Sequence, residues 1–185
     1  MKIDKCELGY IAKKKKISFL WLMVSVLIGV AIFLIGYFWT HTRANIFTVV
    51  AVLMVLPAAK HIVSLIILFS KKGVSKERFD KIKEASGNAI LLTEYVFTST
   101  EKIMNLDFVL IKNGNVLAVK APAKQDVEYM KKYLEDSVHK AAPSFHVKVF
   151  DTDEQLLKQL SKLAQAEAEP AKEEKVVECL RSLAV

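Results

Sequence analysis

Cysteine is scarce in this chain. Only two of the 185 residues are cysteines, Cys6 and Cys179. They stand far apart in the sequence and match neither a zinc-binding nor a redox spacing. The pattern predicts two reduced cytosolic thiols, and acylation of Cys6, which precedes a long apolar segment, is the alternative.

Several common catalytic motifs are also absent. No glycine-rich phosphate loop precedes a helix, which excludes P-loop and dinucleotide-binding enzymes. No Gly-x-Ser-x-Gly elbow is present, which excludes the usual serine hydrolases. The histidines are isolated from one another and predict no metal-ligand cluster; they are His41, His61, His139 and His146.

Acidic residues are rare in the first part of the chain. Residues 1–69 carry eight Lys and Arg against two Asp and Glu, whereas residues 70–185 carry nineteen against eighteen. The net charge of +7 therefore belongs mostly to the first part. The second part lacks the strong positive field of a protein that binds the phosphate backbone, which argues against nucleic-acid binding.

Apolar residues, in contrast, are abundant and concentrated in two runs. Residues 17–39 contain no charge and would form a helix of about 34 Å, enough to cross a bilayer. Residues 46–69 form a second run, and the short connection 40–45 predicts an antiparallel transmembrane hairpin. A signal peptide would have a shorter apolar core followed by small residues, but here the first run ends in Tyr37, Phe38 and Trp39.

Basic residues predict the orientation of this hairpin. The N-terminal segment 1–16 ends in four consecutive lysines, and further Lys and Arg follow the second run, whereas the external loop contains only Arg43. Positive charge favours the cytoplasmic side. We therefore expect an integral protein of the plasma membrane, with the lipid bilayer as its first partner and both termini in the cytoplasm.

Each predicted span carries an unusual helical face. In the first span the face consists of small residues, which let another helix approach closely and predict a seam for the hairpin or for a homo-oligomer; they are Ser18, Ser25, Gly29 and Gly36. Ordinary scatter of small residues is the alternative.

The second span has a polar face, formed by Pro57, Lys60, His61 and Ser64. An ionisable group at membrane depth is costly, so Lys60 and His61 are intramembrane polar candidates for a polar pathway or a lipid head-group site. The alternative is that Lys60 snorkels or that the helix bends at Pro57.

Residues 75–166 predict a cytoplasmic α/β domain. A helix over 75–86 precedes strands over 89–99, 106–112 and 116–121, the last two joined by an Asn-Gly turn; a helix over 123–141, a strand over 144–150 and a helix over 152–166 follow. The order α-β-β-β-α-β-α predicts a mixed sheet covered by helices. Residues 167–185 are expected to lie outside this domain and to form a linker and a short C-terminal helix. The polar stretch 166–175 is typical of a solvated linker, and the helix is expected over 176–183.

The element order and a local motif resemble the restriction-endonuclease-like fold of the PD-(D/E)xK nucleases. Asp107 lies on an apolar strand before a glycine turn, and Lys120 ends the next strand. In that family the Asp and a Glu hold a divalent metal and the Lys assists the attacking water, and two acidic ligands suit Mg²⁺. The resemblance covers residues 75–150.

The sequence departs from that family where the Glu should stand, because Ala118 occupies the position. The resemblance would then require a carboxylate from the following helix. It implies Asp107, Lys120 and Glu128 as catalytic residues and Asp107 with Asp126 as metal ligands. Glu84 or Glu94 would be a further acidic contributor.

Three functions are open at this point. The first is a membrane-tethered cytoplasmic α/β interaction or regulatory module without catalytic activity, which needs no cofactor and binds an unknown protein partner. The second is a membrane-anchored, Mg²⁺-dependent nuclease with a migrated carboxylate. The third is a small transport accessory that uses Lys60 and His61.

Overall fold

The computed structural model describes residues 5–163 and 170–185. The chain divides into two compact units. Residues 11–71 form the helical unit, and residues 1–10 together with 72–185 form the α/β unit.

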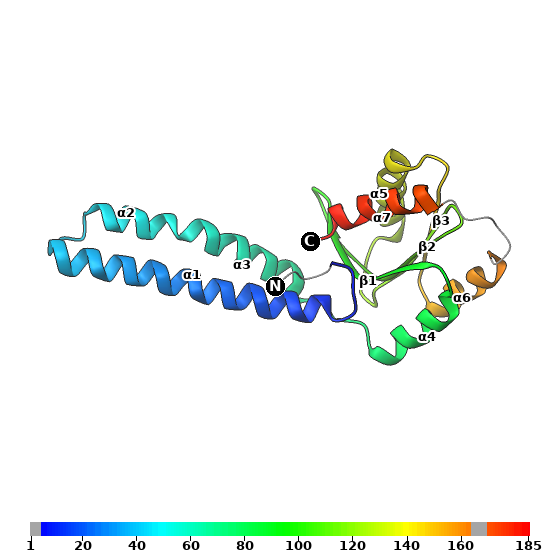
Figure 1. Cartoon of the computed structure of the whole chain (residues 1–185), viewed down its shortest axis with the longest axis horizontal. Coiled ribbons are helices and arrows are strands. Elements are labelled where there is room, and N and C mark those ends of the chain that lie inside the picture. The colour runs from blue at the N-terminus through cyan, green and yellow to red at the C-terminus, as the bar shows by residue number, and fades with distance from the viewer. Residues whose placement is uncertain (1–4, 164–169) are drawn as a thin grey trace. The chain divides into compact units, whose positions relative to one another are not determined.

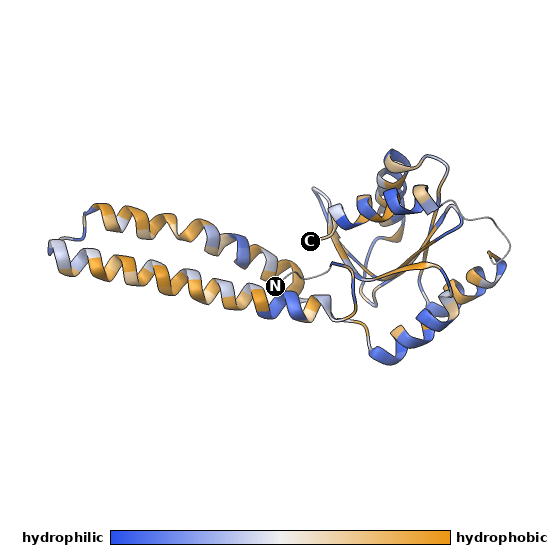
Figure 2. Ribbon diagram, in the orientation of Figure 1, coloured by the Kyte–Doolittle hydropathy of each residue, from blue (hydrophilic) through white to orange (hydrophobic). Residues whose placement is uncertain are grey.

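The helical unit consists of α1 (Tyr10–Thr40), α2 (Ile46–Leu53) and α3 (Val55–Phe69). The first residue of α1, Tyr10, is the last residue of the N-terminal segment that belongs to the α/β unit. These helices are apolar over most of their length (Figure 2). By length and composition, α1 and the combined segment Ile46–Phe69 could each cross a membrane. The prediction of two long apolar helices is confirmed, although α1 begins earlier than residue 17 and includes the four lysines.

The second apolar run is not one uniform helix. Met54 separates α2 from α3, and Pro57 lies in the first turn of α3. Proline has no backbone N–H to donate, and its ring crowds the carbonyl four residues earlier. The interruption therefore lies where Pro57 requires it.

The small-residue face of α1 packs within the chain. Ser18 and Ser25 are buried, and the Ser18 and Ser64 hydroxyls lie 3.3 Å apart. At Gly36 an added Cβ would lie only 2.3 Å from the Cβ of Phe47, so the close approach of α2 requires glycine there. The predicted seam is thus used inside the helical unit, and a homo-oligomer through this face stays a prediction.

The α/β unit contains a four-stranded mixed sheet in the order β1-β2-β3-β4 (Figure 1). Its strands are β1 (Ile90–Thr98), β2 (Ile103–Lys112), β3 (Asn115–Lys120) and β4 (His146–Phe150). The first three pair antiparallel and β4 pairs parallel with β3. Asn113 and Gly114 have positive φ of 50° and 71° in the β2–β3 turn, as the sequence predicts.

Helices cover both faces of this sheet (Figure 1). On one face lie α5 (Val127–Ala141) and α7 (Pro170–Leu183), which contribute Met130, Leu134 and Val176 to the larger core. On the other face lie α4 (Lys76–Ser86) and α6 (Asp153–Lys162), whose Ile82, Leu156 and Leu160 form a second core. The predicted mixed sheet with packed helices is confirmed.

The C-terminal region differs from the prediction. Residues 170–175 of the expected linker belong to α7 rather than to a loop, and residues 166–169 lie outside the described residues. Pro170 suits the first position of a helix because no intrahelical donor is needed there. The buried carboxylate of Glu173 accepts the Asn113 N–H at 2.6 Å, so this polar stretch is tied to the β2–β3 turn.

Both ends of the chain also belong to the α/β unit, which extends beyond the predicted boundaries 75–166. The Cys6 carbonyl accepts the Thr93 N–H at 2.8 Å, and the Val96 carbonyl accepts the Val185 N–H at 3.0 Å. Each end therefore pairs with the outer edge of β1. Covering an edge strand in this way protects it from pairing with other chains.

Candidate functional site

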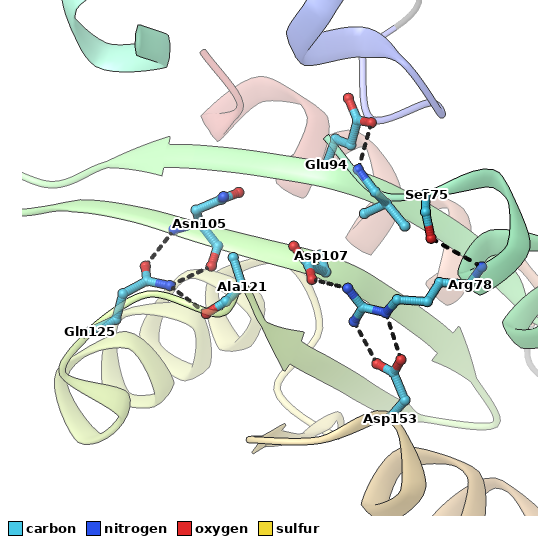
Figure 3. A network of polar contacts seen from close by, with 9 residues as sticks. Ser75, Arg78, Glu94, Asn105, Asp107, Ala121, Gln125 and Asp153 are labelled. Atoms are coloured by element: carbon cyan, nitrogen blue, oxygen red, sulfur yellow. Dashed lines mark hydrogen bonds and ion pairs between the residues drawn. The ribbon is translucent and has the colours of Figure 1, made fainter. Parts of the chain in front are cut away.

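A network of charged side chains joins three elements on the α4/α6 face of the sheet (Figure 3). Arg78 of α4 donates from Nη1 to Oδ2 of Asp107 on β2 at 2.7 Å. The same guanidinium donates from Nε and Nη2 to the two carboxylate oxygens of Asp153, both at 2.7 Å. This bidentate geometry is the strongest form of an Arg–carboxylate pair.

Asp107 reaches this network through an irregularity in the sheet. The pairing of β2 with β3 shifts register between Leu106 and Phe108. On β1, the strand that pairs with the other edge of β2, Glu94 has a φ of 52°, which is unusual for a residue with a side chain. Bulges of this kind redirect side chains, so residues 94 and 107 depart from the regular alternation of the strands.

Burial and ion pairing together set the electrostatics of the network. Asp107 is only 3% exposed, and burial raises the pKa of its carboxyl while the Arg78 ion pair opposes that rise. The hydrogen bonds to Asp153 are the largest cause of the raised Arg78 pKa. The guanidinium carbon also lies 5.3 Å from the centre of the Phe108 ring. Arg78 therefore stays charged and compensates Asp107.

The other residues implied by the nuclease resemblance are held elsewhere. Lys120 pairs with Asp151 at 2.8 Å. Asp126 caps α5 by accepting the Tyr129 N–H at 3.0 Å and pairs with Lys102 at 2.8 Å. Glu128 is exposed in the first turn of α5, Glu84 is exposed on α4, and Ala118 is buried in β3.

This arrangement does not fit a divalent metal ion. The Oδ2 atom of Asp107 already accepts a guanidinium donor, and Asp126 lies in a separate ion pair. Among the residues that the structure describes, no three metal-ligating side chains gather in one place. A hard cation requires several oxygen ligands directed at one point, and these residues do not supply them.

Glu94 has a different role from the acidic contributor that the resemblance implied. Its side chain is 2% exposed, and Oε1 accepts the backbone N–H groups of Gly9 at 3.0 Å and of Val74 at 3.1 Å. A Cβ at Gly73 would lie 2.7 Å from the same oxygen, so glycine is needed for this approach. One carboxylate thus binds the two segments that flank residues 11–71.

A second polar cluster fixes the ends of β2 and β3. The Gln125 side chain accepts the Asn105 N–H at 2.8 Å and donates to the Asn105 carbonyl at 2.9 Å (Figure 3). The Ala121 N–H donates to the same carbonyl at 3.1 Å. These bonds replace regular sheet pairing at the position where β3 ends, so the cluster is structural.

In the helical unit, the predicted polar face of residues 57–64 is divided. The His61 ring stacks on Trp21 with centroids 6.3 Å apart, and Ser64 faces Ser18. Lys60 and Pro57 are exposed. His61 and Lys60 therefore do not form one polar site within this unit.

Sequence reasoning missed Arg78 and Asp153 as the partners of Asp107. In the sequence, Arg78 is one of the basic residues that follow the second apolar run, and Asp153 lies at the start of the predicted helix 152–166. The position of Asp153 in the first turn of α6 suits an acid, because a helix N-terminus carries partial positive charge, but it does not indicate an arginine partner. Arg78 and Asp153 stand 75 residues apart, and no local sequence pattern indicates an ion pair over that separation.

Comparisons with protein-family models, with curated proteins and with solved structures find no match to this chain.

Proposed function

We propose that the chain is an integral membrane protein whose helical unit spans the bilayer as a hairpin and whose α/β unit is a non-catalytic cytoplasmic interaction or regulatory module. The observation that carries the membrane part is the distribution of exposed apolar side chains. Of the large hydrophobic residues that are exposed in the described chain, all but Ile103 lie between Phe19 and Phe69. Such a continuous apolar surface requires a cover, and a bilayer provides it.

The orientation follows from charge. Lysines 13–16 and 71–72 flank the apolar stretch of residues 17–69, and Arg43 is the sole charge in the connection between α1 and α2. By the positive-inside tendency, both termini and the α/β unit are cytoplasmic, and the plasma membrane is the simplest location.

The non-catalytic assignment is supported by the saturation of the charged residues. Arg78 pairs with both Asp107 and Asp153, and Lys120 pairs with Asp151, so each of these side chains already has an ionic partner. The described surface of the α/β unit also exposes no large hydrophobic residue besides Ile103. A module with this surface suits polar and transient contacts with a protein partner rather than a large obligate interface.

The metal-dependent nuclease is the second candidate. It is favoured by the sheet order with a parallel β3–β4 pair and by the register, in which Lys120 pairs with Leu106, the neighbour of Asp107. Catalysis of this type would require Arg78 to release Asp107 and a second carboxylate to move beside it.

One assay separates the two candidates. The purified full chain in detergent is incubated with single- and double-stranded DNA and RNA in Mg²⁺ or Mn²⁺. We expect no cleavage above the protein-free control. Cleavage that is lost in Lys120→Gln but retained in Lys102→Gln, an exposed lysine in a separate ion pair, would replace the module with the nuclease.

A further inference from the structure

A groove in the helical unit combines an apolar wall with lysine side chains. It lies between α1 and α3, has a volume of about 450 Å³, and is lined by Lys15, Lys16, Phe19, Leu65 and Phe69. Phe19 and Phe69 are exposed to 58% and 84%. The surface of the groove is almost wholly apolar, formed by these rings and by the carbon stems of the two lysines, and Lys16 is exposed to solvent.

The lysines at this groove are arranged around the end of α3. Lys15 donates from Nζ to the carbonyl of Phe69 at 3.2 Å and to the carbonyl of Lys71 at 2.7 Å. The last carbonyls of a helix lack intrahelical donors and favour a cation, so Lys15 is used in closing α3. Lys16 is the next residue, and its side chain is exposed.

No acidic residue in this unit offsets these charges. Residues 11–71 contain seven Lys and Arg and no Asp or Glu. Burial lowers the pKa of Lys71, as expected for an amine removed from water. The helical unit itself therefore supplies no carboxylate to pair with Lys16.

We propose that this groove binds one anionic phospholipid, with its phosphate at Lys16 and an acyl chain against Phe19, Leu65 and Phe69. The proposal rests on the membrane insertion proposed above. An amphiphile with a negative head and an apolar tail matches the exposed Lys16 and the apolar surface of the groove, and basic pockets beside transmembrane helices on the cytoplasmic side suit acidic head groups.

A bound lipid differs from a diffuse attraction of the membrane surface for lysines. Diffuse attraction depends on the number of charges and affects each lysine of the run alike. A site depends on the shape of the groove as well, and on the one lysine at its end. The two cases are separated by variants that alter the groove without changing the charge.

The test is a lipid titration of the full chain in detergent micelles, in which native mass spectrometry measures the affinity of the first bound lipid. Phosphatidylglycerol is compared with phosphatidylcholine of the same acyl chains. We expect tighter binding of phosphatidylglycerol, and a loss of roughly fivefold in Lys16→Gln, the effect of one cation near a head group. Leu65→Trp, which fills the groove, should reduce the affinity without any change in charge.

Two matched variants lie outside the groove. Lys13→Gln removes the same charge from the same helix, and Ile66→Trp adds the same bulk at an exposed neighbour of Leu65. Both should bind phosphatidylglycerol like the unaltered chain, with unchanged helical circular dichroism in all four. Equal losses in Lys13→Gln and Lys16→Gln, or equal affinity for the two lipids, would overturn the site.

Alkaline carbonate extraction of cell membranes distinguishes the failure of this inference from the failure of the proposed function. A chain that is washed off the membrane contradicts the insertion itself, and the lipid site with it. A chain that stays in the membrane but does not discriminate between the lipids contradicts only the lipid site.

Discussion

At the scale of single residues, Arg78 is the side chain on which the α/β unit depends most clearly. It compensates the buried Asp107 and binds Asp153 with two hydrogen bonds. Its own side chain is 37% exposed, so solvent screens part of the interaction. Its effect is therefore best measured by removing it, which leaves the Asp107 charge buried without a partner.

We expect Arg78→Met to destabilise the α/β unit by about 3 kcal/mol, the lower end of the range for removing one partner of a buried ion pair. Urea unfolding of the full chain in detergent, followed by circular dichroism, measures this. Lys102→Met breaks an ion pair whose side chains are 44% and 47% exposed, and should cost less than about 1 kcal/mol. Equal losses in the two variants would contradict the assigned role.

The loss in Arg78→Met should also depend on pH. Without the arginine, burial and the charges of Asp153 and Glu94 act on Asp107 unopposed and raise its pKa further above the ordinary value of 3.8. A raised pKa in the folded state means that stability falls as the pH rises through it. The destabilisation should be large at neutral pH and smaller at acidic pH, where Asp107 is protonated and carries no charge.

At the scale of elements, periodicity and turn chemistry predicted most of the α/β unit. The strands and the Asn113-Gly114 turn follow from alternation and from residues that accept positive φ. The missed features depend on contacts between distant segments. Nothing near Glu173 in the sequence indicates that its carboxylate meets the β2–β3 turn, so a helical segment was predicted as a linker.

The candidate site was less predictable than the fold for the same reason. The nuclease resemblance implies Asp107 as a metal ligand on an apolar strand, whereas in the structure its partner is Arg78 of α4. Similarly, Glu94 stands out as an acid in an apolar strand. Its carboxylate accepts hydrogen bonds from the backbone N–H groups of Gly9 and Val74, on either side of residues 11–71. A carboxylate in an apolar strand indicates that its position is unusual, but only the fold shows which group the carboxylate binds.

Glu94 provides a test at this scale. Glu94→Ala removes the acceptor for the Gly9 and Val74 amides, so we expect faster hydrogen exchange in the peptides that contain them. Exchange in β3 should change little. Glu94→Gln keeps a side-chain oxygen and should retain much of the protection.

The matched control is Glu101→Ala, which alters an exposed acid in the connection between β1 and β2. It should leave the exchange of both peptides unchanged. Uniformly faster exchange across the sheet in Glu94→Ala would instead mean that the carboxylate stabilises the whole unit rather than these two segments.

At the scale of the whole molecule, the native cysteines limit how the proposed orientation is tested. Cys6 is 2% exposed, and burial raises the pKa of its thiol to about 11. A thiol that is buried and protonated reacts slowly with alkylating reagents on either side of a membrane. Failure to label Cys6 would therefore say nothing about topology, and probes at exposed positions are needed.

We expect a maleimide that cannot cross membranes to label Thr42→Cys in intact cells and Lys158→Cys only after permeabilisation. Both positions are exposed, the first in the connection between α1 and α2 and the second on α6, and both variants carry Cys179→Ser. In the proposed orientation, the lysines that flank residues 17–69 keep both termini in the cytoplasm, which would place residue 42 outside. Labelling of Lys158→Cys in intact cells would reverse the orientation, and labelling of neither site before permeabilisation would mean that residues 40–45 do not reach the outer surface.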